Sequence, residues 1–253
     1  MEVKSRFHTV RWFEPIVHYG DLFRAVVYCS YQGDPAKRTW GFSRELDHSC
    51  VSDLTHDMAE IAASMRKDTR NGVRRAEKEG CQFVVVDDLS EYVDYHNAFC
   101  KSKGLDNYVS LEKLRKYEKL LVSKVVHDGI VLSMHISILD EKGHFAISLY
   151  SSSCRLEVNA DRKLIGWGNR LLRYKELEYL KGKGYRTYDW GGVCTDPNDP
   201  RYSIGEFKLS FGGTVVDSWT LKSPMFVILE TIRGICVGAL RVLGRWRSCG
   251  RAS

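Results

Sequence analysis

The chain has 253 residues, of which 43% are hydrophobic and 28% are charged. This length and composition predict a folded protein with one large or two small domains and exclude a low-complexity chain. The formal net charge is +6, which favours anionic partners such as phosphate-bearing small molecules, nucleic acid or a membrane surface.

The chain contains eight cysteines, but they form no CxxC pair, and no group of cysteine and histidine has the spacing of a zinc site. We therefore expect reduced thiols and no metal. The N-terminal stretch MEVKSRFHTVRWF lacks the apolar run of a signal peptide. These features together predict a cytoplasmic location.

Residues 1–45 alternate aromatic, β-branched and polar side chains, which is typical of strands joined by turns. Residues 53–78 are predicted to be helical, with a break near Asp68, and Gly80 is a suitable C-terminal cap. We assign residues 1–80 to a small, truncated N-terminal α/β subdomain.

The next segment, residues 81–222, is predicted to be a second domain. It begins with a strand at residues 81–86. Two helices then follow at 89–103 and 110–121, three strands at 123–127, 130–139 and 144–151, a basic amphipathic helix at 169–183, and strands at 185–190 and 213–221. Asp128-Gly129 has the composition of a tight hairpin turn.

Two glycine pairs frame an unusual lysine in this second domain. The strand at 185–190 leads into Gly191-Gly192, and after a polar insert Phe207-Lys208 leads to Gly212-Gly213. A lysine beside aromatic residues and framed by glycine turns predicts a backbone-lined cleft with one fixed positive charge.

These segments resemble the FemAB/FemX-like branch of the GNAT-fold acyltransferases, which includes peptidoglycan-bridge aminoacyltransferases and BioF2-like acyltransferases. The resemblance rests on the long helix with its Gly-Tyr end, YDWGG at 188–192, FKLSFGG at 207–213, and the basic helix at 65–80. It covers residues 60–222. It implies an α/β (α+β) class with a GNAT-like acyltransferase fold, whose splayed mixed sheet brings donor and acceptor together.

The resemblance places Phe207 and Lys208 at the reaction centre. There the Lys208 ammonium would neutralise the oxyanion that develops when an amine attacks an ester or thioester. The alternative is a solvated lysine, or one paired with Glu206 or Asp217. Asp189 would orient the acceptor amine or take its proton; alternatively, it caps the local turn.

Further substrate-binding candidates are Trp190, beside Asp189, and Arg201-Tyr202, in an insert that contains two prolines. Arginine with an adjacent tyrosine suits phosphate or sugar, unless the insert is an ordinary surface loop. Arg70 and Arg74 lie four residues apart on a basic helix, which is either a solvated face or an anion site for tRNA or a pyrophosphate.

Lys163, Gly166 and Gly168 loosely resemble the pyrophosphate loop of acyl-CoA-dependent GNAT enzymes. Such a loop opens a helix, so that backbone N–H groups cradle phosphates. The resemblance therefore makes these three residues candidates for binding the CoA part of a donor.

The C-terminal segment, residues 223–253, is predicted to form a basic amphipathic helix. Within it, residues 224–247 are strongly apolar but interrupted by arginines, which makes them a poor transmembrane span. They suit a helix lying in an anionic membrane surface. The alternative is a helix docked on the protein itself or on a partner subunit.

We therefore expect an N-acyltransferase that has no tightly bound cofactor and takes acyl-CoA or aminoacyl-tRNA as co-substrate. It would transfer an acyl or aminoacyl group to an amine of a cell-envelope sugar or peptidoglycan-type precursor, an acceptor that is anionic or lipid-linked. Its location would be the cytoplasm, peripheral to the inner face of the membrane. The alternative is a non-catalytic GNAT-fold protein that recruits tRNA or the membrane.

Overall fold

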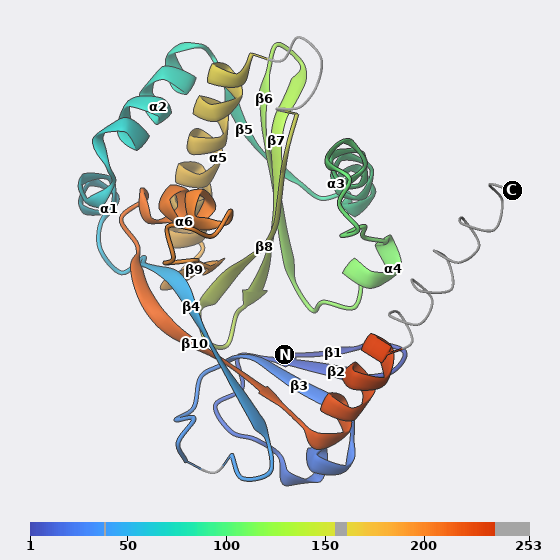
Figure 1. Cartoon of the computed structure of the whole chain (residues 1–253). Helices are drawn as coiled ribbons and strands as arrows, with labels where there is room; N and C mark the ends of the chain where they lie inside the picture. Colours follow the sequence, from blue (N-terminus) through green and yellow to red (C-terminus); the bar gives the residue numbers. More distant parts are fainter. Residues whose placement is uncertain (38, 155–160, 236–253) are drawn as a thin grey trace, which may run out of the picture. The chain divides into compact units, whose positions relative to one another are not determined.

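The computed structural model describes residues 1–37, 39–154 and 161–235 (Figure 1). The chain divides into two compact units, a larger one of residues 47–217 and a smaller one formed by residues 1–46 and residues from 218 onward. Strands β4 (Ser43–Asp53) and β10 (Thr214–Lys222) each begin in one unit and end in the other. The sequence had placed a boundary near residue 80 instead.

The boundary differs because α2 (Lys67–Lys78) belongs to the core of the larger unit. Its buried Val73 and Ala76 pack in one cluster with Ile165 and Leu172 of α5 (Arg162–Gly182). This buried apolar face ties residues 47–80 to the second half of the chain rather than to the first strands.

The sheet of the larger unit has the strand order β4-β9-β8-β7-β6-β5. Neighbouring strands from β5 to β8 are antiparallel, β9 is parallel to β8, and β4 is antiparallel to β9. The bounds are β5 (Gln82–Val86), β6 (Leu120–His127), β7 (Ile130–Asp140), β8 (Phe145–Ser153) and β9 (Thr187–Gly192). The predicted Asp128-Gly129 turn joins β6 to β7, and both residues have a positive φ.

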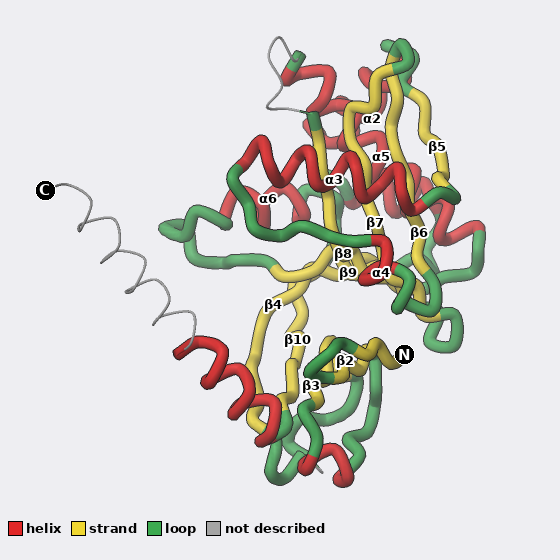
Figure 2. The backbone as a smooth tube through the Cα atoms, turned by 90° about the vertical axis from the view of Figure 1, so that its right-hand side faces the viewer, coloured by secondary structure: helices red, strands yellow, loops and turns green. Residues whose placement is uncertain are grey.

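Helices cover both faces of this sheet. Figures 1 and 2 show α2 and α5 on one face and α3 on the other. The remaining bounds in this unit are α1 (Met58–Ser64), α3 (Leu89–Lys103), α4 (Leu111–Leu114) and α6 (Tyr202–Leu209). The predicted break in the first helical region is present, at residues 65–66 between α1 and α2.

The bounds of two predicted helices were wrong, and helix α6 was not predicted. Helix α5 begins at Arg162, seven residues earlier than expected, because the Asp161 carboxylate accepts hydrogen bonds from the N–H groups of Lys163 and Leu164. The helix expected at residues 110–121 is only α4, since the chain enters β6 at Leu120. Phe207 and Lys208, expected between glycine turns, lie on the short helix α6.

Strands β8 and β9 separate after a short paired stretch. They pair only from Phe145 to Ile147 on β8 and from Thr187 to Asp189 on β9. The later residues of β8 pair with β7 alone, and Gly192 pairs with Ser49 of β4. The sheet therefore splays between β8 and β9, as the resemblance implied.

The smaller unit has the strand order β1-β2-β3-β10 and a core of its own. Its further elements are β1 (Glu2–Lys4), β2 (Thr9–Trp12), the 3₁₀ helix η1 (Tyr19–Phe23), β3 (Val26–Tyr31) and a helical segment at residues 224–235. Among the described residues, no helix is both long and apolar enough to cross a membrane.

Replacing Gly212 by alanine should destabilise the protein more than replacing Gly80. Both glycines have φ near 80°, a strain of about 1 kcal/mol for alanine. A Cβ at Gly80 meets open space, whereas one at Gly212 would lie 2.9 Å from the Ser64 carbonyl carbon. We expect Gly212→Ala to lower the free energy of unfolding by about 3 kcal/mol and Gly80→Ala by about 1 kcal/mol, measured by urea denaturation. Equal losses would show that the contact with Ser64 carries no cost.

Candidate active site

A cleft of about 750 Å³ lies in the larger unit, next to the splay between β8 and β9. Its walls come from α2 and the residue before it, from α3, from the end of β8, from the first turns of α5, and from α6. This volume is in the usual range for a small-molecule site. Four of the predicted site residues line the cleft: Lys163, Gly166, Phe207 and Lys208.

Lys208 reaches from α6 to the end of β9. Its Nζ donates a hydrogen bond of 2.7 Å to the carbonyl oxygen of Gly192. Gly191 has φ 77°, a backbone conformation that favours glycine, and a Cβ there would be in ordinary contact with Lys208 Nζ at 3.6 Å. Burial lowers the pKa of Lys208 to about 8, and the nearby Arg173 guanidinium lowers it too, while Asp189 opposes the shift.

Neither alternative partner considered for Lys208 binds it. Glu206 forms an ion pair with Arg66 at 2.7 Å, and Asp217 lies 3.3 Å from His48. With one proton of the ammonium used by Gly192, Lys208 keeps two donors for a ligand. The geometry therefore matches a fixed positive charge on the cleft wall.

Asp189 lies behind Lys208 and is only 4% exposed. Its Oδ1 accepts hydrogen bonds from the Ser49 hydroxyl and, at 2.7 Å, from the Gly191 N–H. Burial raises the pKa of Asp189, against the lowering by these hydrogen bonds and by Lys208. Asp189 does not line the cleft. The Asp189 carboxylate therefore caps the local turn, as the alternative interpretation predicted, and it also raises the pKa of Lys208. It acts on the cleft through Lys208 and not by direct contact.

Two arginines that sequence reasoning missed, Arg170 and Arg173, line the cleft from α5. Arg173 is 5% exposed and donates to the Tyr188 hydroxyl at 2.7 Å and to Glu176 at 3.2 Å. The Nε–H groups of both arginines are buried and have no hydrogen-bond partner in the described part of the chain. Buried donors of this kind are costly unless something accepts from them, so they favour an anionic or carbonyl-rich ligand.

A signal for Arg173 was present in the helix pattern. Arg173 and Glu176 occupy positions on the same side of α5 as the buried Leu172 and Leu177, where an amphipathic helix carries apolar residues. Charged residues on such a face must be paired or functional.

Phe207 lies on the cleft wall as predicted. Its ring centroid is 5.5 Å from the Arg170 guanidinium carbon and 5.3 Å from the Phe211 ring centroid. The cation–π contact helps to hold Arg170 over the cleft. Trp190, by contrast, is 2% exposed and packs against Phe211 in the core, so it does not reach the cleft.

The expected phosphate loop is part of helix α5. Lys163 and Gly166 lie on the cleft wall in its first turns. Gly168 faces the sheet instead, where a Cβ would lie 2.9 Å from Leu132 Cδ1. It permits close packing of α5 on the sheet, whereas Lys163 and Gly166 remain candidates for donor binding.

Arg201, Tyr202, Arg70 and Arg74 lie outside the cleft walls. Arg201 is exposed and paired with Asp199 at 2.7 Å. Arg70 donates to the carbonyl oxygens of Ala63 and Met65, which anchors the end of α1. Arg70 and Arg74 line a separate cavity of about 230 Å³. Anion binding by these residues stays a prediction.

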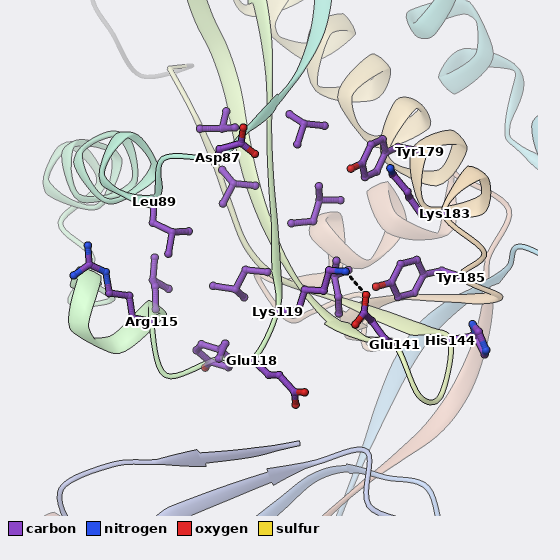
Figure 3. A pocket seen from close by; sticks show the side chains of 18 residues that line it. Asp87, Leu89, Arg115, Glu118, Lys119, Glu141, His144, Tyr179, Lys183 and Tyr185 are labelled. Atoms are coloured by element: carbon purple, nitrogen blue, oxygen red, sulfur yellow. Dashed lines mark hydrogen bonds and ion pairs between the residues drawn. The ribbon is translucent and has the colours of Figure 1, made fainter.

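A second large cavity, of about 600 Å³, lies at the opposite end of α5 (Figure 3). It is lined by Tyr179 of α5, by Lys183 directly after that helix, by Tyr185, and by Lys119 and Glu141, which form an ion pair. None of the predicted site residues belongs to it. The cleft beside Lys208 is therefore the cavity that the sequence motifs identify.

Structure comparisons give consistent matches over most of the chain. FemX superposes with a TM-score of 0.66 and 13% identity, over 91% of this chain and 85% of that chain. The C-terminal DUF2156 domain of a putative lysylphosphatidylglycerol synthetase from Agrobacterium fabrum superposes with a TM-score of 0.61 and 13% identity. The match covers 91% of this chain and 83% of that chain. L-PGS from Bacillus licheniformis superposes with a TM-score of 0.57 and 12% identity, over 87% of this chain and 79% of that chain. The chain has the GNAT-type fold of FemX. At these identities the likeness shows the fold alone.

Sequence comparisons add no family. No protein-family model matches the chain. It is 25% identical over 148 residues to NADH-ubiquinone oxidoreductase chain 6 of Alle alle, over 49% of this chain and 82% of that protein. The chain is 27% identical to NADH-ubiquinone oxidoreductase chain 6 of Alca torda, again over 148 residues, which are 49% of this chain and 82% of that protein. These identities are too low to show kinship.

Replacing Asp189 by asparagine should lower the pKa of Lys208 below its value of about 8, because the carboxylate is the charge that opposes the shift. Asparagine still offers an oxygen to Ser49 and Gly191. The measurement is a ¹³C NMR titration of lysine Cε, with Lys208 identified by loss of its signal in Lys208→Arg. Asp217→Asn, which changes an exposed carboxylate bound to His48, is the matched control. An unchanged midpoint in Asp189→Asn would contradict the electrostatic role.

Proposed function

We propose that this chain is an acyltransferase that moves an acyl or aminoacyl group from an activated donor to an amine. The observation that carries the proposal is the cleft at the sheet splay, where Lys208 and the unpaired Nε–H groups of Arg170 and Arg173 converge. Its fold neighbours FemX and lysylphosphatidylglycerol synthetase support the same general chemistry.

The chemistry of transfer fits the charge of the cleft. The amine lone pair forms a C–N bond to the donor carbonyl, and the carbonyl electrons move to its oxygen. The Lys208 ammonium has two free protons with which to stabilise that oxyanion. When the C–O or C–S bond breaks, the oxyanion collapses and the leaving group departs. With a pKa of about 8, Lys208 is mostly protonated at neutral pH and can serve this role.

The proposed donor is acyl-CoA or aminoacyl-tRNA. Both carry phosphates, and the cleft walls include the cations Arg66, Lys103, Arg162 and Lys163 besides Arg170. Cations that converge on one cleft favour a polyanionic ligand. The phosphates of the donor would therefore lie near the start of α5, with the reactive carbonyl next to Lys208.

The proposed acceptor is an amine on a cell-envelope sugar, a peptidoglycan-type precursor or a lipid-linked molecule. The neighbour named for lysylphosphatidylglycerol supports the lipid-linked form. The helical residues 224–235 expose Met225, Ile228, Ile232 and Ile235, whose spacing of three and four residues puts them on one face. This stripe suits contact with a membrane interface. Residues 236–247 of the predicted membrane helix lie outside the described residues.

Lys208→Ala should fold normally and lose transfer activity by roughly a hundredfold or more, because one oxyanion-stabilising donor is removed. The assay offers candidate amines with acyl-CoA or with aminoacyl-tRNA, and mass spectrometry of the product identifies the donor. Lys183→Ala is the matched control, since Lys183 lies in the other cavity. Wild-type turnover by folded Lys208→Ala would contradict the assignment. Specific tRNA or membrane binding without any transfer would favour a non-catalytic binding protein.

The C-terminal segment should bring the protein to anionic membranes. We expect full-length protein to float with liposomes that contain anionic lipid, and Ile228→Asp with Ile232→Asp to abolish flotation, because both changes put charge on the apolar stripe. Thr231→Asp, which alters an exposed residue between these positions, is the control for added charge. If full-length protein stays in the bottom fraction of the gradient with anionic liposomes, the membrane role is wrong. If truncation after Lys222 lowers the melting temperature and leaves flotation unchanged, the segment is a structural helix.

A further inference from the structure

A chain of buried polar side chains links the cleft to the interior of the sheet beneath α5. Asn169 lies on the cleft wall, and its Oδ1 is 2.9 Å from His135 Nε2. On the other side of the imidazole, Nδ1 is 3.0 Å from Oε1 of Glu176. His135 and Glu176 are 0% and 1% exposed. Neither His135 nor Glu176 takes part in the transfer chemistry proposed above.

Glu176 already has other donors. The Ser123 hydroxyl donates to its Oε1 at 2.5 Å, and Arg173 donates to its Oε2 at 3.2 Å. The Arg173 guanidinium thus balances the carboxylate, and a proton added to His135 would leave an uncompensated positive charge in the core. Burial lowers the pKa of His135, and Arg173 lowers it further, against the opposite effects of Glu176 and Asn169. His135 is therefore neutral.

A neutral imidazole carries one N–H. Because the Glu176 carboxylate can only accept, that proton resides on Nδ1. The lone pair of Nε2 then faces Asn169 and requires a donor. The two ends of an asparagine amide have nearly the same shape, so a half-turn of the Asn169 amide puts its NH₂ group toward Nε2 and its oxygen on the cleft side.

We propose that Glu176 and His135 are positioning residues that hold the Asn169 amide with its oxygen toward the cleft, where it accepts a hydrogen bond from the attacking amine. This inference rests on the proposed function and names a further residue of the same site. The amine keeps its lone pair for the donor carbonyl while one N–H points at Asn169. As the C–N bond forms, the nitrogen becomes positively charged and this hydrogen bond strengthens, which favours the transition state over the ground state.

Asn169 does not take the amine proton, because an amide oxygen is too weak a base. The electron pair of the nitrogen enters the C–N bond, the carbonyl pair goes to the oxygen beside Lys208, and the surplus proton leaves the nitrogen for solvent or for the leaving group. Asn169 and Lys208 therefore act on opposite charges of one intermediate. Asn169 faces the cationic nitrogen, and Lys208 faces the anionic oxygen.

The orientation of the amide can be measured without any substrate. In protein labelled with ¹⁵N at histidine, the signals lost in His135→Gln identify the His135 ring. We expect a protonated Nδ1, an unprotonated Nε2 and no titration between about pH 5.5 and 8.5. In protein labelled with ¹⁵N at asparagine, the side-chain NH₂ protons of Asn169, identified by loss of their signal in Asn169→Asp, should exchange slowly with water. An Nε2-protonated or doubly protonated ring, or a rapidly exchanging NH₂ group, would overturn the proposal.

The role in transfer has its own readout. Asn169→Ala should lower kcat/KM for the amine by roughly ten- to a hundredfold and leave the KM of the donor unchanged. The control is Asn71→Ala, at an exposed position of α2. His135→Gln should restore function relative to His135→Leu, because a glutamine amide can donate to Glu176 and accept from Asn169.

The possible results separate the two proposals. An unchanged kcat/KM for the amine in folded Asn169→Ala would overturn the proposed role of Asn169, and so would equal losses in His135→Gln and His135→Leu. Either result would leave acyl transfer in place. If wild-type protein transfers nothing with either donor, the proposed function fails. The ring and amide signals would then still decide which end of Asn169 faces the cleft.

Discussion

The site depends on one constraint, the separation of β8 from β9 after three paired residues. Beyond Ile147 and Asp189 the two strands share no hydrogen bonds, and β9 turns away at Gly191 with φ 77°. The opening leaves the Gly192 carbonyl free to accept from Lys208. Lys208, the end of β8 and the first turns of α5 then surround one cleft.

Helix α5 supplies the other half of the site because one side of it carries both apolar and ionic groups. Leucines on this side pack on the sheet, while Asn169, Arg173 and Glu176 contact polar side chains that four strands contribute: Ser123, His135, Ser148 and Tyr188. A buried network of this kind is stable only when nearly every member is satisfied. Among the described side chains of this network, the exception is the unpaired Arg173 Nε–H at the cleft, from which the proposed anionic ligand would accept a hydrogen bond.

The two glycine pairs have different structural roles around the cleft. Gly191 and Gly192 shape the opening and offer a carbonyl to Lys208. Gly212 and Gly213 allow close approach to other segments, since a Cβ would meet Ser64 at Gly212 and Cys50 at Gly213. The sequence motif therefore combines one element of the site with one element of packing, and only contacts distinguish them.

The order of elements and the main motifs could be read from the sequence, because alternation, helical periodicity and turn residues are local properties. These identified the Asp128-Gly129 hairpin, the two first helices, and Phe207-Lys208 as part of a cleft. Tertiary structure decided the rest. Trp190 and Gly168 match site-like patterns locally but are used for packing, since their neighbours come from distant segments. Asn169, Arg173, Glu176 and His135 form a site only because α5 crosses the strands, and that contact between distant parts of the chain leaves no local pattern.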